Sequence, residues 1–315
     1  MSYDSASHIT AYNYSIIIPH RNIPDLLQRC LDSIPKREDI QIIIVDDNSD
    51  STIVDFKHFP GLGLPNTEVY FDKTGRGAGK ARNVGLEHAQ GEWVLFADAD
   101  DCFEAGITSV LEQLKNTTED LVYFNITTKY IETNEFTNDS DYFNKILETK
   151  DEFKLRYCLL TPWMKAIRFT LIKDKCLRFE EVQCSNDTRF SALCGYYAKS
   201  VRVLPIIGYC WMQRKDSLWR KKNLNWYIVR YRVNLRIASF FKRNKEIMAS
   251  ESFDSGALNY ISNLEYISIQ KYYLGMLEYG IAKKEWKILF LWAPRYLIHW
   301  MKNILCNVKL KKRIV

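Results

Sequence analysis

The sequence lacks the cysteine patterns of a structural zinc site. Its eight cysteines include no C-x-x-C pair, and no histidine stands beside them at metal-ligand spacing. The N-terminal segment has neither a basic region nor a long apolar region, so we expect no secretory signal. Reduced thiols in a cytoplasm are therefore the simplest interpretation of the cysteines.

The sequence also has no internal repeat and no long linker rich in Pro, Gly or Ser. Its 315 residues are 47% hydrophobic and 14% aromatic, which is enough to bury at least one substantial core. The formal net charge is +6, but nine basic residues and a single acidic residue lie in the segment 283–313. Because the excess positive charge belongs to one tail, a general nucleic-acid binder is not indicated.

Alternating strand and helix patterns predict an α/β fold for the first third of the chain. Ile-rich runs at 14–19 and 40–47 are typical of buried parallel strands, and a helical pattern between them completes a βαβ unit. Further strands are expected at 67–72, 93–97 and 120–126, with a helix at about 104–115. This order predicts a doubly wound layer, in which ligands bind beyond the carboxyl ends of the strands.

The second half of the chain has a different character. Residues 127–150 are polar and weakly periodic, so we expect a surface segment or a loosely packed insertion there. Helix and short-strand patterns are mixed over 151–212, whereas 223–248 and 257–279 have helical patterns. The C-terminal part is therefore predicted to be an α-helical extension.

Acidic residues close two of the predicted buried strands. Asp46 and Asp47 end the second strand, and Asp98, Asp100 and Asp101 follow the fourth. Both groups should lie at the same edge of the sheet and be neighbours in one crevice. Buried carboxylates need a cation or a hydrogen-bonding ligand, and their hard oxygens suit Mg²⁺ or Mn²⁺ bound together with substrate phosphates. The alternative is an acidic turn in which Asp101 caps the following helix.

The stretch GRGAGKARN, residues 75–83, is rich in glycine and carries cations that can approach phosphates closely. It is not a P-loop, because Ala81 follows Lys80 where Ser or Thr is required. Nor is it a dinucleotide fingerprint, because Lys80 takes the place of the third glycine.

Seven motifs in the expected order resemble those of family-2 glycosyltransferases with the GT-A fold. They are SIIIPHRN (15–22), IIIVDDNSDSTI (42–53), GAGKARNVGL (77–86), GEWVLFADADD (91–101), PWMKAIRFTLI (162–172), NDTRF (186–190) and YCWMQRKDSL (209–218). The resemblance covers about residues 14–218 and implies a GT-A domain over 1–218, a Rossmann-like mixed sheet flanked by helices. A nucleotide-sugar half at about 14–126 and an acceptor half at about 150–218 are expected, followed by the helical extension over 219–315.

The resemblance also implies which residues hold the nucleotide sugar. Pro19, His20, Asn22 and Asp47 would surround the base and the ribose. Members of the family often have a hydroxyl residue and an aromatic residue where this sequence has His20 and Arg21. Either side chain could stack on the base in place of the missing ring, or His20 could simply seal the strand end.

Two further motifs imply which residues bind the donor phosphates and the metal. Arg82 and Asn83 match a segment that lies near the donor. Asp98 and Asp100 match the D-x-D motif, in which Asp100 would bind Mg²⁺ or Mn²⁺ and Asp98 would share the metal and lie nearer the ribose. Asp101 could assist. The metal would neutralise the nucleoside diphosphate as it leaves.

The resemblance assigns Asp187 as the base that takes the proton from the acceptor hydroxyl. The spacing alone favours a different role, in which Ser185, Asn186 or Asp187 caps the following helix. Asn186 also departs from the family, where an acidic residue is common at that position.

Trp163 and Lys165 match an aromatic-x-Lys segment that would flank the donor phosphate and the acceptor. The alternative for this pair is a core tryptophan and a solvated lysine.

The basic tail at 283–313 has apolar residues near helical spacing, and its longest apolar run is far below the roughly 20 residues of a spanning helix. It fits an interfacial helix on an anionic membrane surface, or else a terminal helix packed on the protein itself. An interfacial helix would suit a cytoplasmic enzyme lying on the inner face of the plasma membrane.

Together these features predict a metal-dependent, inverting glycosyltransferase that moves a sugar from a nucleotide sugar to a glycan or lipid-linked acceptor, as in the assembly of bacterial surface polysaccharides. One alternative is an Asp-nucleophile phosphatase, although Cys102 departs from its D-x-D-x-[TV] pattern and that motif normally follows the first strand. Another is a non-catalytic, membrane-associated binder of nucleotide sugars.

Overall fold

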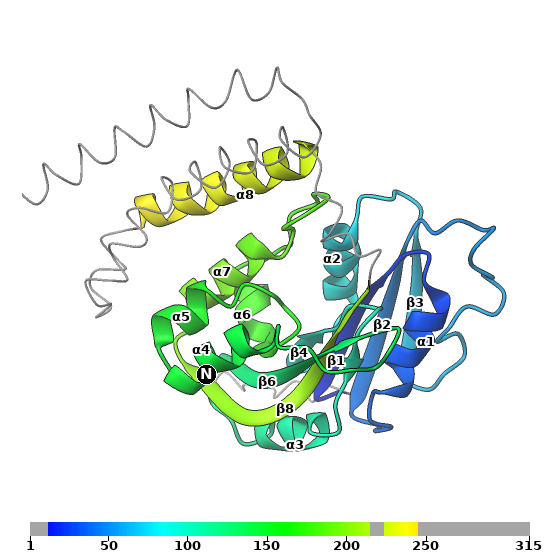
Figure 1. The fold of residues 1–315 in the computed structure, drawn as a ribbon, viewed down its shortest axis with the longest axis horizontal. Helices are drawn as coiled ribbons and strands as arrows, with labels where there is room; N and C mark the ends of the chain where they lie inside the picture. Colours follow the sequence, from blue (N-terminus) through cyan, green and yellow to red (C-terminus); the bar gives the residue numbers. More distant parts are fainter. Residues whose placement is uncertain (1–11, 215–223, 245–315) are drawn as a thin grey trace, which may run out of the picture. The chain divides into compact units, whose positions relative to one another are not determined.

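A computed structural model describes residues 12–214 and 224–244 of the chain (Figure 1). The chain divides into two compact units, Met1–Lys215 and Asp216–Val315. The first unit contains an eight-stranded sheet in the order β3-β2-β1-β4-β7-β6-β8-β5. The strands are β1 (Tyr14–His20), β2 (Ile40–Asp47), β3 (Thr67–Asp72), β4 (Trp93–Phe96), β5 (Cys102–Phe103), β6 (Leu121–Tyr130), β7 (Lys165–Arg168) and β8 (Val201–Gln213).

Helices α1–α7 flank this sheet. They are α1 (Pro24–Asp32), α2 (Ala78–His88), α3 (Ile107–Leu114), α4 (Asp141–Thr149), α5 (Glu152–Tyr157), α6 (Phe169–Asp174) and α7 (Thr188–Tyr197). Helix α2 contacts β1 and β2, α3 contacts β8, α4 contacts β6, and α5 and α6 contact α7. The second unit contains α8 (Leu224–Arg243) among its described residues.

The sheet is mixed, and its parallel part carries the ends of β1, β2 and β4. Strand β1 pairs in parallel with both β2 and β4, and β2 pairs in parallel with β3. Every residue of β1 and β4 is buried, as expected for strands covered on both faces. Strand β7 then runs antiparallel between β4 and β6. The carboxyl ends of the parallel strands therefore share one edge, where the acidic residues follow.

The predicted strands at 14–19, 40–47, 67–72, 93–97 and 120–126 are all present within a few residues of the expected ends. The expected surface segment is confirmed over 131–139, where most residues are exposed, but a loosely packed insertion over 127–150 is wrong. Strand β6 continues to Tyr130 in register with β8, and α4 buries Ile146 and Leu147. The pattern was hidden because Thr and Lys occupy the end of β6, and Thr128 is nevertheless fully buried.

Helix α8 lies within the helical pattern predicted at 223–248. The predicted helix at 257–279 and the basic tail at 283–313 lie outside the described residues. Within the described ranges, no helix combines the length and the apolar character needed to cross a membrane.

Helix α2 carries Arg82 and Asn83 and approaches β1 unusually closely at Gly85. A Cβ atom placed on Gly85 would lie 2.4 Å from Cγ2 of Ile17, a fully buried side chain of β1. Small residues at this position thus set the height of α2 above the sheet.

We expect Gly85→Ala to lower the free energy of unfolding by about 1–2 kcal/mol, because overpacking outweighs the better helix propensity of alanine. Urea denaturation of the purified protein measures this difference. The matched control is Glu87→Ala, at an exposed position of the same helix, which should stay within about 0.5 kcal/mol of the parent. Equal stability of Gly85→Ala and the parent would contradict the close-approach argument.

Candidate functional site

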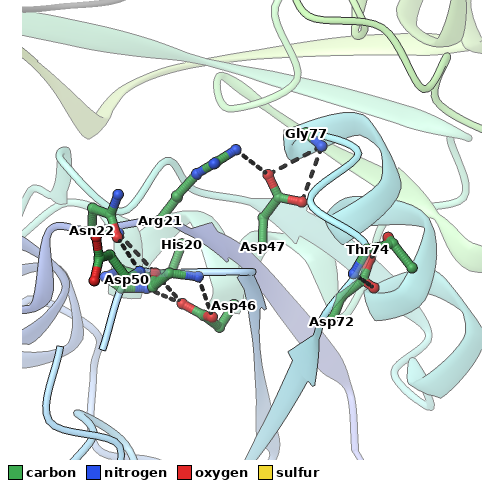
Figure 2. Close-up of polar contacts among 10 residues, drawn as sticks. His20, Arg21, Asn22, Asp46, Asp47, Asp50, Asp72, Thr74 and Gly77 are labelled. Atoms are coloured by element: carbon green, nitrogen blue, oxygen red, sulfur yellow. Dashed lines mark hydrogen bonds and ion pairs between the residues drawn. The ribbon is translucent and has the colours of Figure 1, made fainter. Parts of the chain in front are cut away.

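The end of β1 is tied to the end of β2 by a buried histidine (Figure 2). Nδ1 of His20 lies 2.8 Å from Oδ1 of Asp46, and the backbone N–H of Ile23 donates to Nε2 of His20 at 3.1 Å. Since Nε2 accepts, the ring proton is assigned to Nδ1, which donates to Asp46. Ser49 also donates to Asp46, through its backbone N–H at 3.0 Å and its hydroxyl at 2.5 Å.

This arrangement decides between the two roles left open for His20. Its side chain is fully buried, and the ring edge packs on Phe59. Burial alone would raise the pKa of Asp46, but the hydrogen bonds from His20 and Ser49 lower it below its ordinary value. His20 therefore seals the strand end, and its ring is not presented for stacking on a base. The side chain of Arg21, in contrast, is 53% exposed.

Asn22 continues this connection between the strand ends. Its backbone is left-handed, with φ 57°, a conformation that Asn tolerates. Its N–H donates to the hydroxyl of Ser49 at 2.8 Å, and its side-chain oxygen accepts from the N–H of Asp50 at 2.7 Å. Pro19, in the fully buried strand β1, precedes this network.

Asp47 holds the start of the glycine-rich segment (Figure 2). Both of its carboxylate oxygens accept from the N–H of Gly77 at 3.0 Å, and Arg21 reaches it at 3.5 Å. Gly77 has φ 92°, a left-handed conformation that favours glycine, and it directly precedes α2. Burial raises the pKa of Asp47, more than the hydrogen bond from Gly77 lowers it.

Arg82 of α2 joins the end of β4 to the segment before α7. Its guanidinium donates to Oδ1 of Asp98 at 2.5 Å and to Oδ1 of Asn186 at 2.7 Å. The neighbouring Asn83 exchanges hydrogen bonds with the backbone N–H and carbonyl of Phe179. Helix α2 is therefore connected both to Asp47 through Gly77 and to Asp98 through Arg82, and so links the two acidic strand ends that the sequence predicted to be neighbours.

Asp101 has a structural role. It is buried, and its two oxygens accept from the hydroxyl of Tyr209 at 2.8 Å and from the N–H of Met212 at 2.7 Å. The same hydroxyl accepts from the N–H of Asp98 at 3.0 Å, so Tyr209 bridges the two ends of the DADD turn. Burial raises the pKa of Asp101, with the nearby Asp100 and Asp98 adding to it. The alternative in which Asp101 caps the following helix is wrong, since the N-cap of α3 is Gly106.

The carboxylates of Asp98 and Asp100 remain partly exposed, at 34% and 24%. Each has an arginine on one oxygen: Arg82 on Asp98, and Arg214 on Asp100 at 3.0 Å. Burial, together with the negative charge of Asp98, raises the pKa of Asp100. Two hard, mutually repelling carboxylates fit Mg²⁺ or Mn²⁺, which needs only one or two protein carboxylates when phosphates complete its shell. Across the described residues, no group of three or more His, Cys, Asp or Glu is arranged so that it could hold a metal ion.

Asp187 occupies the N-cap position of α7, but its side chain accepts no capping hydrogen bond from a backbone N–H of the helix; the hydroxyl of Thr188 donates to its Oδ1 at 3.5 Å. Asp187 therefore stands at the predicted N-cap position but does not make the predicted capping hydrogen bond. The carboxylate is half-buried, and burial raises its pKa; Asp98 also raises it, whereas Arg82 and Lys165 lower it. A carboxylate with a raised pKa and no capping bond has the properties of a proton acceptor.

Trp163 and Lys165 both lie in the core. Trp163 stacks on Tyr209, with ring centroids 5.4 Å apart, and is 6% exposed. Lys165 is fully buried: its ammonium donates to the carbonyl of Leu159 at 2.6 Å, and burial lowers its pKa to about 8. The alternative of a solvated lysine is wrong, and the buried ammonium presents no surface to a donor phosphate in this conformation.

The site residues not anticipated from the sequence are Tyr209 and Arg214. Both residues lie in the motif YCWMQRKDSL. Their contacts with Asp101 and Asp100 could not be inferred from the local pattern, because each contact joins residues more than a hundred positions apart. Their only local signal was an aromatic and a cation at the end of an apolar run.

Comparison with known sequences assigns the class of protein. The sequence profile of "Glycosyl transferase family 2" matches residues 15–174. The chain therefore belongs to glycosyl transferase family 2, a family of enzymes, as its motifs predicted. This membership decides against the Asp-nucleophile phosphatase. The match ends before Asp187, so that residue's role rests on its own geometry.

Individual relatives are distant. The chain is 26% identical over 230 residues to "Glycosyltransferase GlyA" of Streptococcus pneumoniae, covering 67% of this chain and 32% of that protein. It is 24% identical over 246 residues to "Putative glycosyltransferase EpsH" of Bacillus subtilis, covering 74% of this chain and 70% of the relative. The chain thus spans about a third of the length of GlyA.

Solved structures show the same fold. Residues 1–349 of S. aureus TarS in complex with UDP-GlcNAc align with a TM-score of 0.56 and 20% identity, covering 84% of this chain and 81% of that one. Mannosyltransferase PcManGT from Pyrobaculum calidifontis, in complex with GDP-Man and Mn²⁺, aligns with a TM-score of 0.52 and 18% identity, covering 95% and 86%. The predicted GT-A fold is confirmed.

We expect Tyr209→Phe to lower the free energy of unfolding by about 1–3 kcal/mol, because the N–H of Asp98 and an oxygen of Asp101 lose their shared partner while the aromatic packing is kept. Thermal and urea denaturation measure the loss. Tyr130→Phe is the control, since Tyr130 is 41% exposed and its hydroxyl makes no hydrogen bond with the described residues. Two equally stable variants would show that the bridge contributes nothing.

Proposed function

We propose that this chain is a metal-dependent, inverting glycosyltransferase that transfers a sugar from a nucleoside diphosphate sugar to an acceptor hydroxyl. The observation that carries the proposal is the chain of contacts from Asp98 through Arg82 to Asn186, beside Asp187. It connects a metal-type carboxylate pair to an uncapped carboxylate of raised pKa. The contacts of Arg82 thus link the proposed donor site to the segment that carries the proposed proton acceptor.

The donor half would use the ends of β1 and β2 for the nucleoside. Asp47 and Arg21 are the proposed groups that meet the ribose and the base, whereas Pro19, His20 and Asn22 position them from the sealed strand end. The exposed Arg21 is the better candidate for stacking on the base, because its planar guanidinium can lie on an aromatic face. The identity of the base is not assigned by these contacts.

Mg²⁺ or Mn²⁺ would be held by Asp100, with Asp98 sharing it. When bound, such an ion stabilises the negative charge that develops on a departing nucleoside diphosphate. Arg82 is proposed to support the same phosphate region, because its guanidinium already holds Asp98. A direct contact of Lys165 with the donor phosphate or the acceptor would require this buried side chain to move. We therefore propose that Trp163 and Lys165 support the acceptor half from within the core.

In the proposed reaction, Asp187 accepts the proton of the acceptor hydroxyl as that oxygen attacks the anomeric carbon. The bond from the anomeric carbon to the diphosphate oxygen breaks, and the nucleoside diphosphate leaves. One direct displacement inverts the configuration at that carbon. A proton acceptor of this kind contributes typically about 10²- to 10⁴-fold to the rate.

The acceptor is proposed to be a glycan or a lipid-linked glycan of a bacterial surface polymer. Support comes from a 35% identical stretch of 100 residues in "Minor teichoic acid biosynthesis protein GgaB" of Bacillus subtilis, which covers 30% of this chain and 11% of that protein. The basic tail at 283–313 would hold the enzyme at an anionic, cytoplasmic membrane surface. Its binding to vesicles remains a prediction.

Donor binding tests the proposal directly. Ligand-observed NMR with UDP-, GDP- and TDP-sugars, with and without Mn²⁺, should detect one donor whose binding needs the metal. Asp100→Asn should weaken this binding by about tenfold or more, because it removes the proposed ligand charge. No donor binding under any condition, with the fold intact by circular dichroism, would favour a different ligand.

Asp187→Asn should lower kcat by about 10²- to 10⁴-fold and leave donor affinity unchanged, because it removes the proton acceptor but not the donor contacts. Initial rates with the donor identified above, together with its Kd, separate the two effects. Asp174→Asn, at an exposed position at the end of α6, is the matched control and should keep full activity. Full activity of Asp187→Asn would remove Asp187 from the mechanism.

The raised pKa of Asp187 sets the direction of the pH dependence. The base must be deprotonated, so the rate should fall as pH decreases through its pKa, and burial places this limb above the ordinary range of an Asp, near 3.9. The groups that act on it are Asp98, which raises the pKa, and Arg82 and Lys165, which lower it. A kcat profile from pH 4 to 8 that is flat on the acid side would contradict this assignment.

A further inference from the structure

Two cysteines face each other across the last pair of strands in the sheet. Cys102 of β5 is directly opposite Cys210 of β8 in an antiparallel register. Two residues further along the ladder, the N–H of Glu104 donates to the carbonyl of Gly208. Because the two classes of pair alternate along antiparallel strands, Cys102 and Cys210 are also a hydrogen-bonded pair. Such pairs have Cα atoms about 5.5 Å apart, within the range of about 4.4–6.8 Å for a disulfide, but their Cβ atoms lie farther apart than the roughly 3.5–4.5 Å that the bond needs, so the bond closes only if β5 moves toward β8.

The surroundings favour reaction between these two thiols. Both are free, and Cys102 is half-buried whereas Cys210 is fully buried. Cys102 is therefore the thiol that an oxidant in solution can reach first. Strand β5 is only two residues long and lies at the edge of the sheet, so it can move toward β8 without breaking the central ladder.

We propose that Cys102 and Cys210 form a reversible disulfide when the protein meets a small disulfide oxidant. In the first step the sulfur of Cys102 attacks the oxidant RSSR, giving Cys102–S–S–R and releasing one RSH. In the second step the sulfur of Cys210 attacks the Cys102 sulfur, closing the Cys102–Cys210 bond and releasing the second RSH. Two protein thiols are oxidised and one RSSR is reduced to two RSH.

The disulfide would act on the DADD turn through its immediate neighbours. Cys102 follows Asp101, and Cys210 follows Tyr209, whose hydroxyl joins Asp101 to the N–H of Asp98. Drawing β5 toward β8 therefore shifts both ends of this bridge, and with them Asp98 and Asp100. We expect oxidation to weaken metal-dependent nucleotide binding; this consequence rests on the proposed function, whereas the pairing of the cysteines does not.

The pairing is tested on the full chain, treated with oxidised glutathione, quenched with a thiol-alkylating reagent and digested for mass spectrometry. The expected result is a peptide pair linking Cys102 to Cys210, lost on treatment with dithiothreitol. Cys102→Ser and Cys210→Ser should each abolish it, and Cys176→Ser, at an exposed cysteine elsewhere, should not. Alkylation of both Cys102 and Cys210 in oxidised parent protein would overturn the proposal, and this outcome needs no variant to be folded.

The effect on the site is tested by calorimetric titration of UDP with Mn²⁺ into reduced and oxidised protein. We expect oxidised protein to bind about tenfold more weakly, and dithiothreitol to restore the affinity. In Cys102→Ser the oxidant should change nothing. Equal affinities despite a mapped disulfide would overturn the coupling to the donor site. Absence of UDP binding by reduced protein would count against UDP as the donor nucleotide and leave the mapped pair standing.

Discussion

A carboxylate placed at the end of a buried strand must be satisfied by donors, and this constraint shapes the whole edge of the sheet. Asp46 is satisfied by His20 and Ser49, Asp47 by the N–H of Gly77, and Asp101 by Tyr209 and Met212. These donors come from the end of β1, the loop after β2, the residue before α2, and β8. Meeting the constraint therefore orders the loops after β2 and β4 as well as the start of α2.

The same constraint distinguishes the structural carboxylates from those that are available to a ligand. Asp46 and Asp101 have donors on both oxygens and little freedom to bind anything else. Asp98 and Asp100 each have one recorded side-chain partner and keep exposed surface, and Asp187 lacks the capping bond that its position allows. Carboxylates that keep exposed oxygens at an otherwise completed edge are the candidates for binding a ligand.

The sequence predicted the parallel strands and the two acidic strand ends, because buried Ile-rich runs and the Asp residues after them are local features. It did not predict the long pairing of β6 with β8, where Thr and Lys mask the pattern. Nor did it predict which carboxylate is structural: Asp101 and Asp100 are adjacent, and they differ only through Tyr209 and Arg214, which are distant in the chain. The roles of neighbours in a motif are set by tertiary partners that spacing cannot encode.

The electrostatics of this edge explain why a divalent cation belongs in the proposed reaction. Burial raises the pKa of Asp100 and of Asp187, and the charge of Asp98 adds to both. Arg82 and Arg214 are already paired with Asp98 and Asp100, and Arg29 donates to the backbone carbonyl of Asp100. A nucleoside diphosphate brings further negative charge, so it gains little here unless positive charge accompanies it. A cation that relieves the repulsion between the carboxylates also attracts the diphosphate, so metal and donor should each strengthen the binding of the other.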